Sequence, residues 1–279
     1  MGIRDIIPHL VGGDPKDIHH SFHELGLAGK DVSLDAASAL WQFASHHPSD
    51  HLRGNYYPAL VEWARFLVFC RDMCRWKLKV AMDGAENIHK QPEIARRQQR
   101  VAAAEARNDM RGQVKNTPEY IAMAAHVCKF LNIEYCVAPY EADPQVAYTS
   151  MKHSAVTVTC DSDLLAYGVS GKLVVVKGFH NHTYRVIDLN ADVASGEYPL
   201  FDLYIQHGRV LFQLYAACRG CDFTECPSGI RGVGYEMFIR LVTNIATLNP
   251  NSLANALWEN ENNILISMRR AMSMTKTQM

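Results

Sequence analysis

Short apolar runs alternate with longer segments in which apolar residues recur at helical spacing. The predicted buried strands are short and rich in Val, Ile and Leu, and they lie at 31–34, 78–82, 133–138 and 155–159. Amphipathic helices are predicted where apolar residues follow the 3.6-residue period, at 36–45, 57–74 and 118–130. This alternation predicts an α/β fold with a mostly parallel central sheet flanked by helices.

The second half of the chain begins with a different pattern. Two apolar runs, 172–177 and 183–189, predict a strand pair around a turn at 178–182. An apolar helix is then predicted at 210–221, and glycine-rich punctuation precedes a further helix that begins at Tyr235.

Acidic side chains follow four of the predicted strands and the helix at 210–221. They are Asp35, Asp83, Glu141 with Asp143, Asp161 with Asp163, and Asp222. Acids that simply begin helices would explain one pair, because the helix dipole favours them there, but two pairs indicate a divalent metal site. The carboxyl ends of parallel strands converge, and bare carboxylates in one cleft would raise each other's pKa. Two Mg²⁺ ions, which Mn²⁺ can replace, would relieve this repulsion and clamp a phosphodiester.

The segment 87–115 is basic, with a local excess of four positive charges. Its middle is strongly helical and poor in large apolar residues, so it is not a core helix. Lys90 and Arg97 lie seven residues apart, two turns along one helix face, where both could point at phosphate oxygens. The acids alone would also suit a phosphatase, but together with this helix they favour a polymeric phosphate substrate. A plain solvated surface helix is the alternative.

Composition sets few further limits. The chain has 279 residues, of which 48% are hydrophobic and 20% charged, and its formal net charge is -1, so nucleic-acid binding would need a local patch. The eight cysteines lack regular spacing, which indicates reduced thiols in an intracellular protein, and we interpret Cys218, Cys221 and Cys226 as structural. No apolar run suits a signal peptide or a membrane span, so we expect no membrane partner.

Other side chains have ordinary interpretations. We predict that Trp63, Phe66 and Phe69 pack in the core, because they follow helical spacing. Four histidines lie in predicted turns, where solvated side chains are the default and metal binding is the less favoured alternative: His46, His47, His180 and His182.

Several motifs occur in an order that is typical of one family. They are V-S-L-D-A, V-A-M-D-G, A-P-Y-E-A-D-P-Q-V-A-Y, C-D-S-D-L-L-A-Y-G, and G-C-D-F with G-I-R-G-V-G, and they lie within residues 1–245. In these motifs the chain resembles the flap endonuclease and exonuclease-one branch of the structure-specific 5′-nuclease superfamily, whose fold is PIN-like. The A-P-Y-E-A-D motif is more similar to exonuclease one than to flap endonuclease. This resemblance implies a Mg²⁺-dependent 5′–3′ exonuclease or 5′-flap endonuclease that hydrolyses DNA by two metal ions in repair or replication.

The resemblance also implies roles for individual residues. The first metal would be served by Asp35, Asp83, Glu141 and Asp143, and the second by Asp161, Asp163 and Asp222. Lys90 and Arg97 match the basic pair that steadies the scissile phosphate. Trp41 matches an aromatic position that stacks on a base, with core packing as the alternative. Residues 229–234 resemble the hairpin of a helix-two-turn-helix element, which holds K⁺ in relatives. The expected DNA contacts are Gly2, Trp41, Arg96, Arg100, Gly229, Arg231, Gly232 and Gly234.

The resemblance divides the chain into two domains. We expect a PIN-like core at 1–205, with a helical arch at about 87–118, and a C-terminal helical region at 206–279. The arch interval is shorter than is usual in the family, which leaves threading of 5′ ends open. We expect a nuclear monomer, with a mitochondrial location left open, that binds DNA bearing a 5′ end or flap beside a duplex junction and has no sliding-clamp motif. An inert PIN-like scaffold that binds nucleic acid or protein, and a nuclease that acts on RNA, are the alternatives.

Overall fold

The described part of the chain forms two compact units. The computed structural model describes residues 3, 6–11, 18–86, 90–153, 155–169, 171–190, 198–220, 230 and 233–248. One unit contains the described residues from 18 to 190, and the other contains those within 3–11 and 198–248. The predicted domain boundary at 205 stays a prediction. No helix in these described ranges is long and apolar enough to cross a bilayer.

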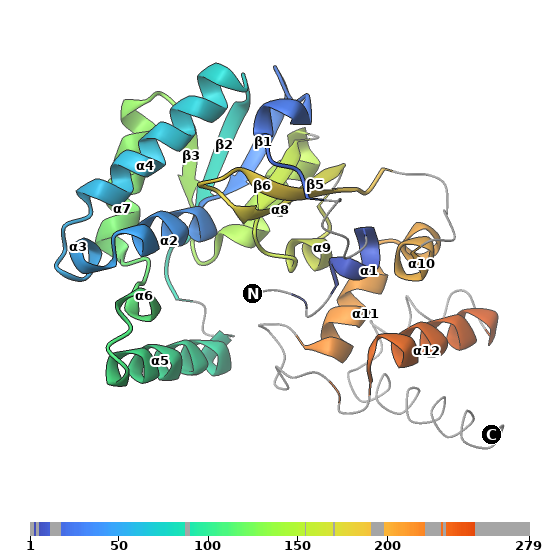
Figure 1. The fold of residues 1–279 in the computed structure, drawn as a ribbon. Helices are drawn as coiled ribbons and strands as arrows, with labels where there is room; N and C mark the ends of the chain where they lie inside the picture. Colours follow the sequence, from blue (N-terminus) through green and yellow to red (C-terminus); the bar gives the residue numbers. More distant parts are fainter. Residues whose placement is uncertain are drawn as a thin grey trace. The chain divides into compact units, whose positions relative to one another are not determined.

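A six-stranded sheet organises the first unit (Figure 1). Its strand order is β3-β2-β1-β4-β5-β6, and all neighbours run parallel except β5 and β6. The strands are β1 (Asp31–Asp35), β2 (Lys77–Met82), β3 (Glu134–Val137), β4 (Val156–Thr159), β5 (Lys172–Gly178) and β6 (Thr183–Asp188). The predicted mostly parallel sheet and its terminal strand pair are therefore confirmed.

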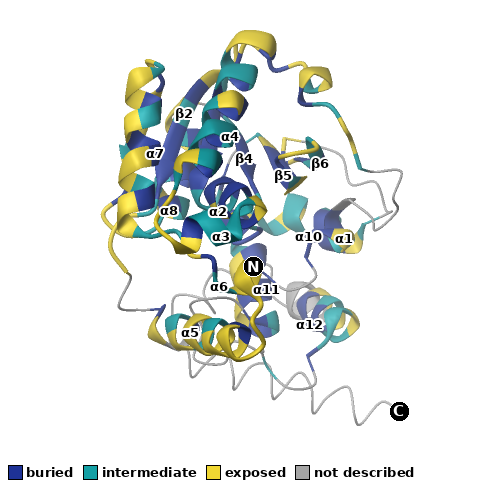
Figure 2. Ribbon diagram, turned by 60° about the vertical axis from the view of Figure 1, so that its left-hand side comes forward, coloured by how far each residue is buried: buried dark blue, intermediate teal, exposed yellow. Residues whose placement is uncertain are grey.

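Helices cover both faces of this sheet. In β1, Val32 and Leu34 are fully buried on one face, whereas the intervening Ser33 donates a hydrogen bond to Val146 O at 3.3 Å on the other. Val146 lies in α8 (Ala142–His153), which packs against β1, β2 and β4. The Val32 face belongs to the core formed with α2 (Ala36–His46), α4 (Tyr57–Val68) and α7 (Pro118–Phe130). Figure 2 shows the buried sides of these helices turned toward the strands.

Aromatic side chains fill the core between the sheet and α4. Trp63 is fully buried, Phe66 is 5% exposed, and their ring centroids are 6.0 Å apart. Phe69 packs against the same core and stacks on His182 with 4.5 Å between centroids. The predicted packing of these three aromatic residues is confirmed. The helix predicted at 57–74 consists of α4 followed by a π-helical turn, η3 (Phe69–Met73).

Short connecting helices were harder to predict. His46 and His47 were expected to lie in a turn, but α2 extends through His46, and Pro48 at the first helical position opens α3 (Pro48–Leu52). The first unit also contains the short helices η2 (Phe22–Leu25) and α9 (Leu164–Tyr167) and the basic segment 87–115. That segment forms α5 (Gln91–Ala106) and α6 (Met110–Gln113); α5 is largely exposed and covers neither face of the sheet in Figure 1.

The second unit is helical in its described residues. It contains α1 (Pro8–Val11), α10 (Pro199–His207), α11 (Arg209–Arg219) and α12 (Tyr235–Leu248). Tyr215 and Phe238 are fully buried and meet edge to face with centroids 4.9 Å apart. The predicted helices at 210–221 and from Tyr235 correspond to α11 and α12, whereas α10 was not predicted. Cys218 is buried, and this burial raises the pKa of its thiol to about 12, in keeping with its structural interpretation; Cys221 and Cys226 lie outside the described residues.

Candidate active site at the ends of the parallel strands

Six of the predicted metal ligands lie at the carboxyl ends of four neighbouring strands. Asp35 ends β1, and Asp83 directly follows β2. Glu141 and Asp143 lie at the start of α8 after β3, and Asp161 and Asp163 lie between β4 and α9. Because β3, β2, β1 and β4 are consecutive in a parallel arrangement, the fold brings these side chains to one edge of the sheet.

Mutual electrostatic effects show that these carboxylates lie near one another. Burial, followed by the charge of Asp83, raises the pKa of Asp35 to about 7, and Asp161 adds to this rise. Burial raises the pKa of Asp143 well above its usual range, with the charges of Asp35 and Asp161 as the next causes. The site thus concentrates negative charge that is costly without a cation.

Hydrogen bonds fix the positions of Asp35 and Asp161. The carboxylate of Asp35 accepts from Ala37 N at 3.0 Å and from Thr159 Oγ1 at 2.9 Å. The same Thr159 oxygen accepts from Asp161 N at 2.9 Å, and Asp161 Oδ1 accepts from Asp163 N at 3.0 Å. Thr159 therefore connects the ends of β1 and β4. Sequence reasoning missed it, although its place two residues before Asp161 at a strand end was a usable signal.

A second set of contacts joins the ends of β2 and β3. Asp83 Oδ1 accepts from Ala142 N at 2.8 Å, so the loop after β2 holds the start of α8. Gly84 donates its N–H to Tyr140 O, and a Cβ at Gly84 would overlap the carbonyl oxygen of Ala138. Only glycine fits this approach, which explains the Asp-Gly pair at the end of β2.

The two predicted phosphate-directed cations face the acids. Lys90 is 3% exposed, and its Nζ lies 2.7 Å from Glu141 Oε2. Burial raises the pKa of Asp83 and of Glu141, and the charges of Lys90 and Arg97 offset part of each rise. The amino-terminal end of the basic segment is thereby held beside the carboxylates.

Glu93 is a further residue that sequence reasoning did not single out. It is 1% exposed, although α5 is largely exposed, and it forms ion pairs with three arginines. The nitrogen–oxygen distances are 2.5 Å for Arg96, 3.1 Å for Arg97 and 2.6 Å for Arg100. The pairs at i+3 and i+4 follow helical spacing, which was the available signal. Glu93 gathers these guanidinium groups on one side of the helix.

The expected DNA contacts fall into two groups. The side chain of Trp41 is 40% exposed, so the alternative that it packs in the core is wrong. Its indole nitrogen donates a hydrogen bond to Val114 O at 3.2 Å. Stacking of Trp41 on a base stays a prediction. Gly234 lies just before α12, where its carbonyl accepts from Phe238 N at 2.9 Å. The other predicted residues of the C-terminal hairpin and of the site lie outside the described residues: Gly2, Asp222, Gly229, Arg231 and Gly232.

The chemistry of this donor set fits hard divalent cations. Carboxylate oxygens are the ligands that Mg²⁺ prefers, and a cation would favour the charged forms that burial now disfavours. Within the described residues, no three of these acids bring oxygens within 4.8 Å of one another. An ion held by these acids as they lie would therefore need water to complete its ligands.

A surface pocket at the other end of the strands lacks these features. It has a volume of about 370 Å³ and is lined by Asp31, Lys79 and Glu134 among others, at the amino ends of β1, β2 and β3. Lys79 Nζ lies 2.7 Å from Glu134 Oε2 and 3.9 Å from Asp31 Oδ1, so the charges there neutralise one another. The concentrated, unbalanced charge lies at the carboxyl end of the sheet.

Comparisons with known proteins agree with this placement. Residues 132–222 match the family model of the XPG I-region. Exonuclease 1 of Xenopus laevis is 32% identical over 259 residues, which cover 87% of this chain and 33% of that protein. Flap endonuclease 1 of Pyrobaculum aerophilum is 27% identical over 273 residues, which cover 89% of this chain and 76% of that protein. The chain thus spans about a third of the exonuclease and three quarters of the endonuclease.

Solved structures share the fold. Human GEN1 in complex with Holliday junction DNA matches with a TM-score of 0.61 and 18% identity, covering 98% of this chain and 63% of that chain. GEN1 in complex with product DNA and Mg²⁺ matches with a TM-score of 0.53 and 18% identity, over 94% of this chain and 58% of that chain. The sheet, the acids at its carboxyl edge and the matched relatives lead to one conclusion. In sequence and in fold, this chain is similar to the XPG, flap endonuclease and exonuclease-one type of structure-specific 5′-nucleases, whose fold is PIN-like.

Proposed function

We propose that this chain is a Mg²⁺-dependent nuclease that hydrolyses DNA phosphodiesters at a free 5′ end or a 5′ flap. The observation that carries the proposal is the cluster of carboxylates that raise one another's pKa beside Lys90 and Arg97. An inert scaffold has no need to bury several carboxylates beside one another, because like charges that are buried together cost stability. Metal ions bound by the carboxylates and a phosphodiester bound by Lys90 and Arg97 would explain why acidic and basic side chains occur together here.

Two ions would divide the acids between them. Asp35, Asp83, Glu141 and Asp143 would hold one ion, while Asp161 and Asp163, with Asp222, would hold the other. When bound, Mg²⁺ would activate the attacking water and stabilise charge on the leaving oxygen. Mn²⁺ has the same preference for carboxylates and water and would substitute. The Mg²⁺ found with product DNA in the GEN1 structure supports this choice of ion.

Residues of the chain would position the phosphate. Lys90 and Arg97 would donate to its non-bridging oxygens, where negative charge grows during the reaction. The contact between Lys90 and Glu141 holds the ammonium group at the metal site before DNA arrives, so little reorganisation is needed. The remaining arginines of α5, together with exposed Trp41, would hold the DNA backbone and a base near the cut.

The wider features of the proposal follow the relatives. Residues 229–234 would bind the duplex through a helix-two-turn-helix hairpin that holds K⁺, and the protein would act as a monomer in nuclear DNA repair. The DNA in the GEN1 structures supports a DNA substrate, and the names of the matched exonuclease and flap endonuclease support cleavage at chain ends and flaps. The short arch formed by α5 and α6 favours substrates whose 5′ end does not need to thread far.

The test is a cleavage assay with purified protein. Substrates that carry a 5′ label as a flap, a nick, a blunt duplex or an RNA duplex are incubated with Mg²⁺ or with EDTA. We expect Mg²⁺-dependent cleavage of DNA, and loss of cleavage but not of DNA binding in Asp163→Ala. The control is Asp31→Ala, because Asp31 lies at the opposite end of β1 and should leave the rate within about twofold.

Each other outcome favours an alternative. DNA binding without cleavage in any condition would support an inert scaffold and end the enzyme proposal. Cleavage confined to RNA would replace the substrate class while keeping the metal site. Cleavage that persists in EDTA would contradict the metal mechanism.

A further inference from the structure

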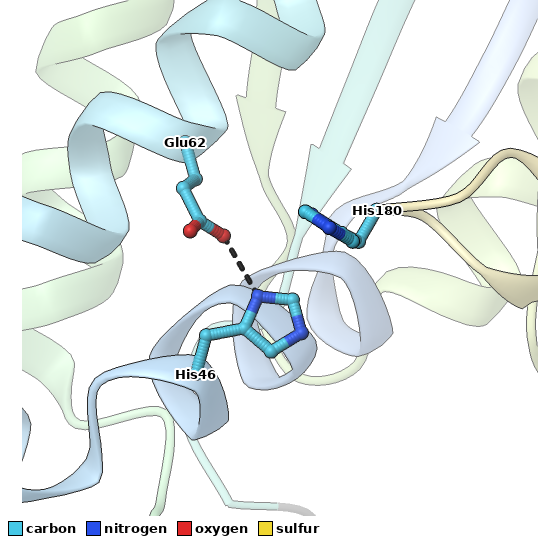
Figure 3. Close-up of side chains that lie close together, drawn as sticks. All are labelled: His46, Glu62 and His180. Carbon is cyan, nitrogen blue, oxygen red and sulfur yellow. Dashed lines mark hydrogen bonds and ion pairs between the residues drawn. The ribbon is translucent and has the colours of Figure 1, made fainter.

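Three ligand-type side chains meet on the surface away from the acids. His46 ends α2, Glu62 lies in α4 and His180 lies in the turn between β5 and β6; Figure 3 shows their side chains projecting toward one another. One donor atom of each lies within 4.8 Å of the other two, and no second group of this kind occurs in the described ranges. These residues are far apart in sequence, so the tertiary fold brings them together.

The contacts within the group are close. His46 Nδ1 lies 2.8 Å from Glu62 Oε2, and His47 Nε2 lies 3.0 Å from Glu62 Oε1. The rings of His46 and His180 have centroids 5.0 Å apart and are nearly perpendicular. Glu62 therefore has one oxygen beside the His46–His180 pair, while His47 holds the other oxygen and fixes the orientation of the carboxylate.

The turn that carries His180 is anchored to α2 and α4. Phe179 N donates to Gln42 Oε1 at 3.0 Å, which ties the turn to α2. The Phe179 side chain is 1% exposed and packs edge to face against Phe66 of α4, with centroids 5.4 Å apart. The backbone next to His180 is thus held by a hydrogen bond and by the core, so the turn that carries this histidine is fixed beside α2 and α4 before any ligand binds.

Imidazole nitrogens and a carboxylate oxygen suit Zn²⁺ and related transition ions rather than Mg²⁺. At bond lengths of about 2.0–2.2 Å, neighbouring donors around tetrahedral Zn²⁺ lie roughly 3.4 Å apart. His46 and Glu62 already meet within that distance, and the donor atom of His180 lies within 4.8 Å of both. We propose that His46, Glu62 and His180 form a second metal site that binds Zn²⁺ and leaves a fourth position for water.

This site would act on structure rather than on the phosphodiester. A bound ion would tie the carboxyl-terminal end of α2 to α4 and to the β5–β6 turn. The other end of α2 begins at Asp35, and its middle carries Trp41. The ion would therefore stabilise a helix that contributes to the candidate active site without touching the reacting atoms.

The experiment uses the full chain after EDTA treatment, in millimolar Mg²⁺ that competes for the carboxylate cluster. Co²⁺ is titrated as a spectroscopic probe, and Zn²⁺ is then added to displace it. We expect visible d–d absorption that saturates at one equivalent and disappears with Zn²⁺. Zn²⁺ in about hundredfold excess over its dissociation constant should raise Tm by roughly 5 °C or more.

His180→Gln is the decisive variant, because it removes a donor while leaving both hydrogen bonds to Glu62 in place. We expect about a tenfold or greater loss of Co²⁺ affinity and loss of the Zn²⁺ shift in Tm. His126→Gln is the matched control, since His126 is an exposed histidine on α7, and it should bind as the wild type does. Equal Co²⁺ binding by His180→Gln and wild type, or no binding by either, would overturn the proposal whatever the nuclease assay gives.

Discussion

The ammonium group of Lys90 lies 2.7 Å from Oε2 of Glu141, so a buried cation contacts one of the expected metal ligands. Burial raises the pKa of Glu141, and the hydrogen bond and charge of Lys90 are the largest influences that lower it. Lys90 thus favours the ionised carboxylate that a metal needs, in addition to its proposed contact with phosphate.

Replacing Lys90 by Met should slow cleavage by about 10²-fold, because a positioned cation at the developing charge is lost. The pKa of Glu141 should also rise, which moves the acidic limb of the pH–rate profile to higher pH. Single-turnover rates measured across pH test both effects. Lys115→Met is the control, since Lys115 is exposed and lies outside the acid cluster. A uniform fall in rate without any shift of the profile would contradict the role at Glu141.

The metal-free protein should lose stability as pH rises from about 4 to 7. The pKa of Asp35 is raised from 3.8 to about 7 by burial and by Asp83, so the native state retains a proton that the unfolded chain releases. For this group alone the effect is at most about 4 kcal/mol at 1.36 kcal/mol per pKa unit. The contribution of Asp35 should therefore make Tm in EDTA higher at pH 5 than at pH 7.5.

Asp35→Asn isolates that contribution, because it keeps the side-chain shape and removes the titration. The variant should flatten the dependence of Tm on pH in EDTA. Added Mg²⁺ should raise the wild-type Tm at pH 7.5 more than at pH 5, since binding requires ionised carboxylates. A pH dependence in EDTA that is identical in Asp35→Asn and wild type would refute the assignment.

Glu93→Gln should release the three arginines that its carboxylate gathers. If Glu93 positions Arg97, cleavage should slow roughly tenfold, because a misplaced cation stabilises the transition state poorly. Loss of a negative charge alone would instead tighten DNA binding. Binding and single-turnover rates therefore separate the two effects. Glu105→Gln changes the same charge at an exposed position of α5 and should leave the rate within about twofold. A wild-type rate for Glu93→Gln would remove the positioning role.

Trp41→Ala should weaken binding of substrate DNA by about 1–3 kcal/mol if the indole stacks on a base. Trp41→Phe loses the hydrogen bond to Val114 O but keeps an aromatic face. Because that face can still stack on a base, this variant should retain most of the affinity for DNA. Fluorescence anisotropy with flap DNA measures both. Tyr57→Ala removes an aromatic side chain that is 74% exposed on α4 and serves as the control. Equal losses for Ala and Phe would indicate that the hydrogen bond matters instead.

Gly84→Ala should damage the site without removing any functional group. The added methyl would overlap the carbonyl of Ala138, so the loop that carries Asp83 must move relative to Glu141. We expect lower affinity for Mg²⁺ in activity titrations and a loss of stability of about 1–3 kcal/mol, as for overpacked sites. Gly54→Ala is the comparison, because a Cβ there has open space around it and only the backbone strain of φ +80°. Unchanged Mg²⁺ dependence in Gly84→Ala would show that the loop tolerates the shift.

The strands and their acids were predictable because each run of apolar residues stops where an acid begins, as Asp35 and Asp83 illustrate. The burial of Glu93 was not predictable, because its helix has no apolar stripe and the arginines that enclose it come from the same polar segment. The extension of α2 through His46 was missed because histidine and proline usually indicate a turn. Here Pro48 begins a helix instead of ending one.

The place of Asp35 affects how knock-out variants should be interpreted. One side chain ends β1, caps α2 through Ala37 N and accepts from Thr159, so the same atoms that would ligate a metal also hold the polypeptide in shape. An inactive Asp35→Ala protein would not distinguish lost chemistry from a frayed helix. The Asp35→Asn variant, which keeps the side-chain shape, therefore separates the two roles better than Asp35→Ala does.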